Sequence, residues 1–382
     1  FINMNFEITE EHKLIQKTAR DFAINELQPE VLKRDEEKIW PKEAVSKMSD
    51  LGFLGIMVDP KYGGGGMDTI AYTIAMEEIA RVDPAASVIM SVNNSLVCSL
   101  LSYFGNDFQK EKYLTRLAKG ELLGAFSLSE PQSGSDASNM LTYAKKEGSS
   151  YILNGTKNWV TNGKNSDIVI VAALTEKGVG HKGISCFIVE KSYKGFESGK
   201  PEKKLGIRSS DTTELYFENV VIPEENLIGD EGDGFKICLE TLDGGRIGIA
   251  SQALGISQAS LDASIKYSKE REQFGKPISS FQSIQFKMAD MSISIDAARF
   301  LTRKAAWLKD NHQPYGISAA KAKLYASEVA MKSSTECVQI HGGYGYIRET
   351  GVERFMRDAK ITQIYEGTSE IQRLVIARDL LK

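Results

Sequence analysis

The residue best suited to acid–base chemistry lies near the end of the chain, where Glu366 stands among apolar and aromatic neighbours and is followed by Gly367. Apolar surroundings disfavour the charged form of a carboxyl group and make its carboxylate a stronger base. Gly367 has no side chain, so a ligand could approach the backbone closely there. The same residues also fit a solvated loop, with Thr368 or Ser369 as the N-cap of a final helix. The residue types alone leave both interpretations open.

Two segments in the first half of the chain carry residue types that could hold a polar or aromatic ligand. Leu128–Asp136 is small, polar and rich in turn residues. Its backbone N–H groups and hydroxyls could bind a phosphate or the edge of a heteroaromatic ring. Trp159–Gly163 places a large ring and a hydroxyl beside a second turn. An ordinary polar loop and a core tryptophan are the alternatives for these two segments.

Other kinds of site are disfavoured by residue spacing. The 4 histidines (His12, His181, His312 and His341) share no metal-ligand spacing, and the 4 cysteines (Cys98, Cys186, Cys238 and Cys337) form no C-x-x-C pair. We therefore predict no metal site and no disulfide scaffold. Gly342–Gly345 follows a helical pattern rather than a strand, which argues against a Rossmann dinucleotide site. The chain contains neither a P-loop nor the G-x-S-x-G of serine hydrolases.

The composition is that of a globular protein. The chain has 382 residues, of which 42% are hydrophobic and 26% charged, and its net charge of −4 gives no basic field for nucleic acid. The longest apolar stretch, Ala85–Leu101, contains Asn93 and Asn94 and is predicted to be a buried helix rather than a membrane span. No signal peptide opens the chain, and Phe1–Asn3 before Met4 are interpreted as an addition to the natural start. We expect a soluble protein of a reducing compartment.

The residues before about Gly120 have helical periodicity. Thr9 is a suitable N-cap for a helix whose apolar residues continue at helical spacing to Leu27. Another helical segment begins at Pro41, and more are predicted over Ile70–Ala80, Ser87–Phe104 and Gln109–Ala118.

After Gly120 the pattern changes to that of short strands. Asn154-Gly155 follows Tyr151–Leu153 and predicts a hairpin turn, because both central residues of a type I′ turn need φ > 0. Further strands are predicted over Ile168–Val171, Ile184–Val189 and Leu215–Val221. Beyond Gly234, helices are predicted over Phe235–Arg271, Phe281–Lys309, Ile317–Gln339 and Glu370–Leu381. We predict an α+β protein with an N-terminal helical domain (1–120), a middle antiparallel β domain (121–232) and a C-terminal four-helix bundle (233–382).

Several segments together resemble the acyl-CoA dehydrogenase family, in the family's order and over essentially the whole chain. The segments are Phe126–Pro131 with Gly134–Asp136, Trp159–Asn162, Arg271–Gly275, Gln339–Gly345, Arg357–Ala359 and Ile364–Thr368. The resemblance implies the α-β-α domain order predicted above, one FAD per subunit and a homotetramer built as a dimer of dimers. It also implies that Glu366 removes the α-proton of an acyl thioester while a β-hydride passes to flavin N5. The backbone N–H of Glu366 and a ribityl hydroxyl of FAD would bind the thioester carbonyl.

The resemblance also assigns roles to individual residues. Phe126, Leu128, Ser129 and Ser135 would line the flavin and the thioester, Trp159 would stack on the flavin, and Thr161 would bond near N5. Arg271, Gln282, Gln339 and Gly343 would reach the FAD of a neighbouring subunit, and Thr368 and Glu370 would make further FAD contacts. Asp243 and Arg246 would contact the CoA arm, Gly367 the substrate, and Ile249, Gln252 and Thr362 would close the acyl cavity.

Three positions bear on the branch of the family. Relatives of the isovaleryl and long-chain types carry their base at the position of Gly245, and glutaryl types carry an arginine that we align with Ser87. Glycine cannot act as a base, and the absent arginine indicates a neutral acyl tail. Leu242–Gly255 resembles the short-chain members, which favours substrates of about four carbons, although one methylene changes selectivity by only ~1–3 kcal/mol.

The resemblance therefore implies dehydrogenation of a short-chain acyl-CoA to a trans-2-enoyl-CoA, with electrons passed to an electron-transfer flavoprotein. A preference for medium or branched chains, an acyl-CoA oxidase and a crotonyl-CoA reductase running in reverse are enzymatic alternatives. A non-catalytic flavoprotein scaffold or a nucleic-acid-binding member represents a different class. The expected location is the cytoplasm of a bacterium, or the mitochondrial matrix for a processed eukaryotic chain.

Overall fold

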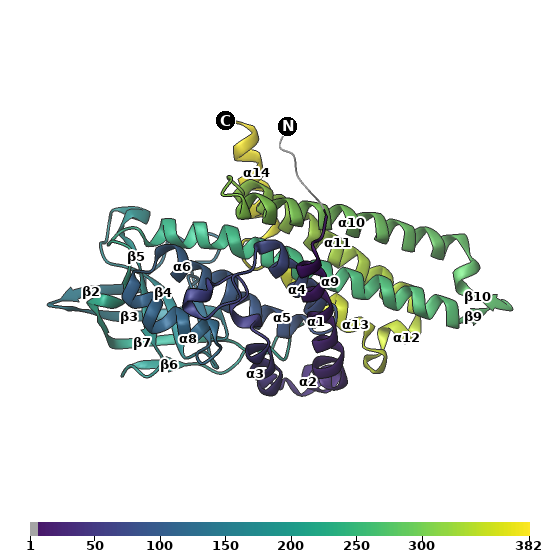
Figure 1. Ribbon diagram of the computed structural model, residues 1–382, viewed down its shortest axis with the longest axis horizontal. Coiled ribbons are helices and arrows are strands. Elements are labelled where there is room, and N and C mark those ends of the chain that lie inside the picture. The colour runs from purple at the N-terminus through teal and green to yellow at the C-terminus, as the bar shows by residue number, and fades with distance from the viewer. Residues whose placement is uncertain (1–6) are drawn as a thin grey trace.

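The computed structural model describes residues 7–382, so the interpretation of residues 1–3 lies outside the described part. The N-terminal region is helical, as predicted, and Thr9 caps α1 by accepting a hydrogen bond from the His12 N–H. The helices are α1 (Glu10–Phe22), α2 (Val31–Glu37), α3 (Lys42–Asp50), α4 (Thr69–Ala80), α5 (Pro84–Ser91), α6 (Ser99–Phe104), α7 (Asp107–Gln109) and α8 (Thr115–Ala118). In Figure 1, α1–α5 lie in the lower middle of the molecule, below α10.

One stretch of the described chain is long and apolar enough to cross a membrane. It is Pro84–Phe104, with 21 residues and a mean hydropathy of 1.4, but 89% of its most apolar window is buried inside the protein. Asn93 and Asn94 are buried and donate to the backbone carbonyls of Leu54 and Phe53. The stretch is therefore a core helix, as its two asparagines predicted.

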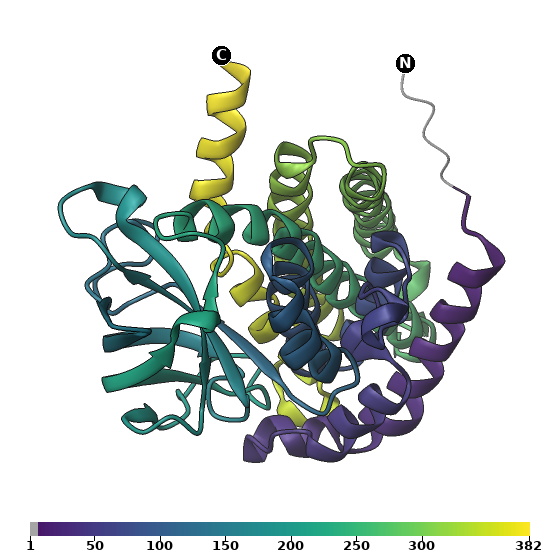
Figure 2. The ribbon, with the colours of Figure 1, turned by 60° about the vertical axis from the view of Figure 1, so that its left-hand side comes forward.

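The middle region forms one eight-stranded sheet in the order β6-β7-β3-β2-β4-β5-β8, with β1 beside β4. The strands are β1 (Gly124–Ser127), β2 (Tyr143–Glu147), β3 (Ser150–Thr161), β4 (Ile168–Leu174), β5 (Ile184–Glu190), β6 (Phe196–Ser198), β7 (Thr212–Pro223) and β8 (Leu227–Ile228). Only the pairs β1–β4 and β2–β4 are parallel. Figure 2 shows this mainly antiparallel sheet to one side of the helices.

The predicted hairpin turn at Asn154-Gly155 is wrong. β3 continues through both residues, and the turn that joins it to β2 lies at Gly148, whose φ is +62°. Asn154 accepts a hydrogen bond from the Asn219 N–H of β7, and the register of β3 against β7 shifts between Leu153 and Gly155. The Asn-Gly pair thus serves a β-bulge, where glycine relieves crowding as it does in a turn.

The C-terminal region consists mainly of long helices. α9 (Gly234–Glu270) has 37 residues and matches the predicted helix within one residue at each end. The other elements are β9 (Glu272–Gln273), β10 (Lys276–Pro277), α10 (Gln282–Asp310), α11 (Gly316–His341), α12 (Gly343–Tyr346), α13 (Val352–Thr362) and α14 (Ser369–Leu380). α9, α10 and α11 pack together, and α13, which the sequence analysis did not predict, packs against α9 and α11. α14 packs on α11 and leads the chain to its C-terminus (Figure 1).

Candidate active site

Glu366 lies in the turn that connects α13 to α14. Its φ is +52° and that of Gly367 is +90°, a half of backbone space that residues other than glycine seldom adopt. The Glu366 side chain is partly buried, and its Oε2 atom is fully buried with no hydrogen-bond partner among residues 7–382. Burial raises the pKa of the Glu366 carboxyl to about 7, although the positive charges of Lys323 and Arg246 oppose the increase. This carboxyl can therefore exchange a proton near neutral pH.

The Glu366 carboxyl occupies space that Gly245 of α9 leaves open. A Cβ atom at position 245 would lie 2.9 Å from Glu366 Cδ and 2.7 Å from Leu96 Cδ2, and it would overlap Glu366 Oε2. Carbon atoms in contact prefer about 3.5–4.0 Å, so any side chain at position 245 would displace the carboxyl. The glycine is thus part of the site although it contributes no chemistry.

Two buried side chains hold the carbonyl groups of the Glu366 turn. Lys323 Nζ of α11 donates to Gly367 O at 2.7 Å, and Gln372 Nε2 of α14 donates to Gly367 O at 3.0 Å and to Glu366 O at 3.1 Å. Thr368 caps α14 by accepting from the Ile371 N–H, so the predicted capping role is present although the Glu366 side chain is partly buried. None of the hydrogen bonds found in the described chain is donated by the Glu366 N–H, which leaves this donor available to a ligand.

Arg246 and Asp243 lie on α9 next to Gly245. Arg246 is buried and its Nη1 donates to Asp243 Oδ1, while its Nε has no hydrogen-bond partner in the described residues. Burial raises the pKa of Asp243, and the Arg246 charge acts against this increase. The pair therefore brings balanced charges close to the Glu366 carboxyl.

A cavity of about 400 Å³ opens beside this part of α9. It is lined by Ser95, Ser99, Leu100, Tyr103, Phe104, Glu240, Thr241, Gly244, Lys309, His312, Gln313 and Tyr315. Gly244 is the neighbour of Gly245, so the cavity approaches the position of the carboxyl. Burial lowers the pKa of Lys309 to about 8, which places a cationic group in the wall at neutral pH. The cavity can accept an elongated ligand that carries polar groups.

The residues expected to close an acyl cavity lie on α9 and at the end of α13. Ile249, Gln252 and Thr362 are fully buried. Gln252 Nε2 donates to Pro84 O at 2.7 Å, and its Oε1 accepts from the hydroxyl of Tyr365, the residue that precedes Glu366. Gln252 thereby ties α9 to both α5 and the Glu366 turn.

The residues expected to contact a flavin lie on β1 and β3 and in the segment after β1. Asn158 N donates to Ser129 O at 2.9 Å, which holds the two segments together. Trp159 has a φ of +59° and an exposed fraction of 61%, so the core-tryptophan alternative is wrong. Leu128 belongs to the same apolar cluster as Tyr365, whereas Ser135 lies exposed beyond it. An exposed indole on a sheet surface fits a planar aromatic ligand.

A buried ion pair supports this surface from below. Lys157 and Glu130 are 0% and 2% exposed, and Lys157 Nζ lies 2.8 Å from Glu130 Oε1 and 3.1 Å from Leu128 O. Glu130 also accepts from the Leu141 and Thr142 N–H groups. Burial alone would raise the pKa of Glu130, but Lys157 and these donors lower it to about 2.

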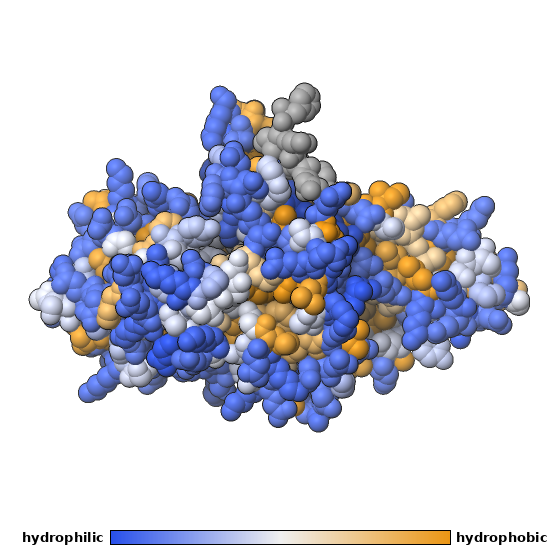
Figure 3. Space-filling model, viewed as in Figure 1, coloured by the Kyte–Doolittle hydropathy of each residue, from blue (hydrophilic) through white to orange (hydrophobic). Residues whose placement is uncertain are grey.

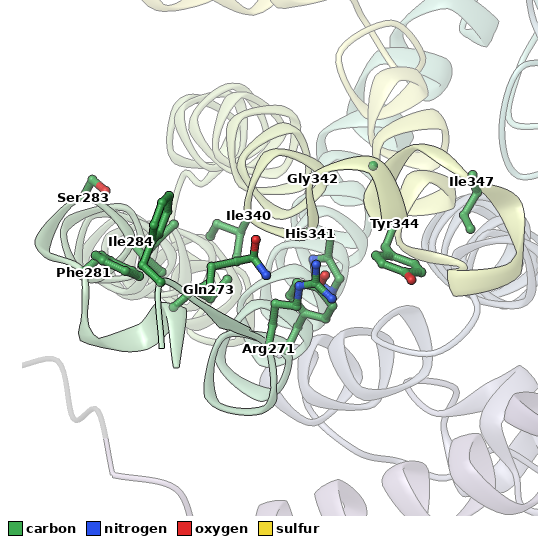
Figure 4. A pocket seen from close by; sticks show the side chains of 14 residues that line it. Arg271, Gln273, Phe281, Ser283, Ile284, Ile340, His341, Gly342, Tyr344 and Ile347 are labelled. Carbon is green, nitrogen blue, oxygen red and sulfur yellow. The ribbon is translucent and has the colours of Figure 1, made fainter. Parts of the chain in front are cut away.

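The remaining predicted cofactor residues lie elsewhere. Arg271 and Gly343 line a second cavity of about 670 Å³ (Figure 4). Gln282 and Gln339 are not among the lining residues but are next to Phe281, Ser283 and Ile340 in the sequence, which are. In Figure 4, Arg271 extends towards the Gly342–Tyr344 segment, and its guanidinium lies 5.6 Å from the centre of the Tyr344 ring. At 1.5 Å per residue along α9, this cavity is about 39 Å from Gly245. A ligand at Gly245 would therefore have to extend about 39 Å to reach this cavity within one chain.

Comparison with known proteins agrees with this geometry. Models of the acyl-CoA dehydrogenase N-terminal, middle and C-terminal domains match residues 9–121, 125–220 and 232–381. The chain belongs to the acyl-CoA dehydrogenase family. It is 49% identical over 379 residues to "Acyl-CoA dehydrogenase, short-chain specific" of Clostridium acetobutylicum, covering 99% of this chain and 100% of that one. It is also 49% identical over 381 residues to the mitochondrial short-chain specific enzyme of Rattus norvegicus, covering 100% and 92%.

Solved structures of high similarity share the fold. Butyryl-CoA dehydrogenase from Megasphaera elsdenii superposes with a TM-score of 0.98 at 48% identity, covering 99% of this chain and 100% of that one. A chain in a structure described as "Electron transferring flavoprotein of Acidaminococcus fermentans" has the same TM-score at 50% identity, with the same coverage. The family and the three-domain fold expected from the sequence are confirmed, and the protein is an acyl-CoA dehydrogenase, an oxidoreductase.

The dehydrogenase contains site residues that the sequence analysis missed. Lys323 and Gln372 hold the Glu366 turn, and Lys309 and Tyr315 line the cavity beside α9. None of these residues belongs to a motif that the sequence singled out. The local sequence gives no signal for Lys323: it lies between Ala322 and Leu324, whereas Lys321, which is flanked by two alanines, is exposed.

Proposed function

We propose that this dehydrogenase oxidises a short-chain acyl-CoA of about four carbons to the trans-2-enoyl-CoA, with Glu366 as the base and FAD as the cofactor. The observation that carries the proposal is the buried, unpartnered Glu366 Oε2, which lies against Gly245 and next to a substrate-sized cavity. A base whose pKa is about 7 is matched to proton transfer at neutral pH.

The side chain and the backbone of Glu366 have separate roles in proton removal. The Glu366 carboxylate takes the α-proton, which is very weakly acidic even beside a thioester. The Glu366 N–H, which has no acceptor in the described chain, donates to the thioester oxygen as negative charge develops there. Lys323 and Gln372 fix the two carbonyls on the other side of the turn, so this N–H keeps its direction. When bound, FAD supplies the acceptor for the β-hydride.

The residues present fit a flavin. The exposed Trp159 ring offers a stacking surface, and Leu128, Ser129 and Thr161 on the joined segments offer apolar and polar contacts beside it. Phe126, Ser135, Thr368 and Glu370 complete the set that we propose for this flavin. The second cavity, with Arg271 and exposed aromatic side chains such as Phe274, suits the adenosine and phosphate portion of a dinucleotide.

The distance between these two regions supports a homo-oligomer. We propose that the second cavity, with Arg271, Gln282, Gln339 and Gly343, serves the FAD of a neighbouring copy, as a homotetramer built from dimers would require. α10 exposes Phe286, Ile293 and Phe300 at intervals of seven residues, with exposed fractions of 63%, 68% and 56%. Figure 3 shows apolar surface over the region of α10 and α11. Such a stripe is typical of a helix that packs against another chain.

Several separate observations support the proposed substrate and electron acceptor. The cavity beside α9 would hold the CoA arm near Asp243 and Arg246, while Ile249, Gln252 and Thr362 would limit the acyl chain. The relatives named as short-chain specific and butyryl-CoA dehydrogenases support four carbons. The similar chain in the electron transferring flavoprotein structure supports such a flavoprotein as the acceptor. We place the enzyme in the bacterial cytoplasm, or in the mitochondrial matrix if the chain is eukaryotic.

The test is an anaerobic titration of the FAD-loaded protein with butyryl-CoA and octanoyl-CoA while the visible flavin absorbance is recorded. We expect rapid bleaching with butyryl-CoA and slow bleaching with octanoyl-CoA. Glu366→Gln should still bind FAD and acyl-CoA but bleach at least about a hundredfold more slowly. Near-normal bleaching by this variant would refute the base assignment, and faster bleaching by octanoyl-CoA would refute the chain length. Peroxide formation without an added acceptor would identify an oxidase instead.

A further inference from the structure

Lys323 is a buried cation, although holding the Glu366–Gly367 turn requires only a hydrogen-bond donor. It lies on α11, is 0% exposed and takes part in no ion pair of the described chain. Its one hydrogen bond there is the 2.7 Å contact from Nζ to Gly367 O. Burying an ammonium without a paired carboxylate is unfavourable, and burial accordingly lowers the pKa of Lys323 to about 8. A neutral side chain could hold the same carbonyl at a smaller cost, as Gln372 does.

The charged groups around Lys323 explain what its charge can act on. Glu366 and Glu370 approach it from the turn and α14, Arg246 from α9, and Glu328 from its own helix. Asp243 neutralises Arg246 through their ion pair. On α4, burial and the Glu366 charge both raise the pKa of Tyr72, so its hydroxyl, which lies 3.0 Å from Ser91 Oγ, stays neutral. Lys323 and Arg246 are the two positive charges that lower the pKa of Glu366, and of these only Lys323 takes part in no ion pair within residues 7–382.

The hydrogen bond and the charge act on the same two residues. The Lys323 and Gln372 donors converge on Gly367 O and maintain a turn in which Glu366 has a φ of +52°. A non-glycine residue in this conformation needs outside support, because it is disfavoured by about 1 kcal/mol or more. The turn directs the carboxyl into the space beside Gly245, where Oε2 is buried without a hydrogen-bond partner in the described residues and burial disfavours the carboxylate form. A nearby ammonium counteracts that penalty.

We propose that Lys323 is a positioning residue for proton abstraction: its ammonium fixes the Glu366–Gly367 turn and keeps Glu366 in the carboxylate form that can accept a proton. The inference rests on the proposed role of Glu366 as the base. It assigns two separable actions to one side chain, a hydrogen bond that Gln372 shares and a charge that Gln372 lacks. Loss of Lys323 should change the proton affinity of Glu366, whereas loss of Gln372 should change only its placement.

The test compares four variants of the FAD-loaded enzyme. Lys323→Gln removes the charge but retains an amide donor, Lys323→Met removes both, and Gln372→Met removes only the neutral donor. Lys321→Gln removes a charge from the exposed face of the same helix and is the matched control. Two properties are measured against pH: the infrared band of the protonated Glu366 carboxyl without substrate, identified by its absence in Glu366→Gln, and kcat/KM with butyryl-CoA.

We expect Lys323→Gln and Lys323→Met to raise the pH at which the Glu366 band is lost by about one unit, since an opposite charge typically shifts a carboxyl pKa by 1–3 units. At pH values below this transition, kcat/KM should fall about tenfold further than in the parent enzyme, and Lys323→Gln should recover most of the rate at higher pH. Gln372→Met should lower kcat at every pH without moving the band. Lys321→Gln should change neither property.

An unmoved Glu366 band in both Lys323 variants would overturn the inference, as would an equal shift in Gln372→Met or Lys321→Gln. The infrared measurement does not depend on turnover, so it distinguishes this failure from failure of the proposed function. If Glu366→Gln kept normal activity, the base assignment would fall even though Lys323 still shifted the Glu366 band. If Glu366→Gln were inactive and the band did not move, only the role of Lys323 would fall.

Discussion

Replacement of Gly245 by alanine tests whether an open space on α9 sets the position of the base. The added Cβ would lie 2.9 Å from Glu366 Cδ and 2.7 Å from Leu96 Cδ2, and closer still to Glu366 Oε2. Restoring ordinary contacts of about 3.5 Å or more requires the carboxyl to move by roughly 1 Å. The carboxyl is the free end of a flexible side chain, so we expect the shift to have little effect on folding. Alanine also favours the helix over glycine by about 0.5–1 kcal/mol.

The effect on proton transfer should be much larger than the effect on stability. A misplacement of about 1 Å can reduce a rate by up to about a hundredfold, so we expect Gly245→Ala to bleach the flavin ten to a hundred times more slowly with saturating butyryl-CoA. The melting temperature should change little. Gly244→Ala is the comparison variant, because a Cβ there meets Lys309 Nζ at 3.4 Å, an ordinary contact, and does not reach Glu366. Gly244 lines the cavity proposed for the CoA arm, so both variants are compared at saturating butyryl-CoA, where weaker binding alone does not slow bleaching. Normal bleaching by Gly245→Ala, or equal losses in both variants, would refute the steric argument.

Two further predictions concern ionisation. Because burial raises the pKa of Glu366 to about 7 and the base must be a carboxylate, kcat/KM should rise with pH through this value and then level off; a flat profile would contradict the assignment. The folded state also binds this proton more tightly than the unfolded state, so stability should decrease as pH rises towards about 7, and urea denaturation should show a smaller decrease in Glu366→Gln. Lys157→Met should lower the free energy of unfolding by roughly 3–5 kcal/mol, because Glu130 would remain charged without its partner. The double variant with Glu130→Gln should recover much of this loss, and equal stability of the two variants would contradict the ion-pair explanation.

The fold was largely predictable where local sequence dominates. The 37 residues of α9 have helical periodicity and few strong breakers, and they form one helix within a residue of the predicted ends. The Asn154-Gly155 turn was not predictable, because the same residue pair serves a bulge when β7 lies alongside. α13 was missed although Arg354 and Asp358 form an ion pair four residues apart, because their burial depends on the distant partners Val82 O and the Ile207 N–H.

The site was predictable only in part for a similar reason. The sequence around Glu366 drew attention to the carboxyl, its glycine and the cap at Thr368, all of which are neighbours in the chain. Lys323 is 44 residues from Gly367, and nothing in its local sequence indicates which carbonyl it holds. The open space at Gly245 is likewise a property of the packed helices. The sequence therefore indicated the reactive carboxyl of Glu366, but it did not indicate the distant residues Lys323 and Gly245 that position it.

The placement of Glu366 depends on contacts between all three regions of the chain. Arg357 on α13 bonds to Asp35 of the N-terminal region at 2.7 Å and to Leu205 O of the middle region at 3.1 Å. The neighbouring Asp358 accepts from the Ile207 N–H. These contacts anchor α13, and the Glu366 turn follows directly from its last residue, Thr362. Because α11 and α14 hold the other side of the turn, the carboxyl can reach the Gly245 space only when the three regions are packed together. The geometry of the proposed active site and the packing of the three regions are therefore coupled.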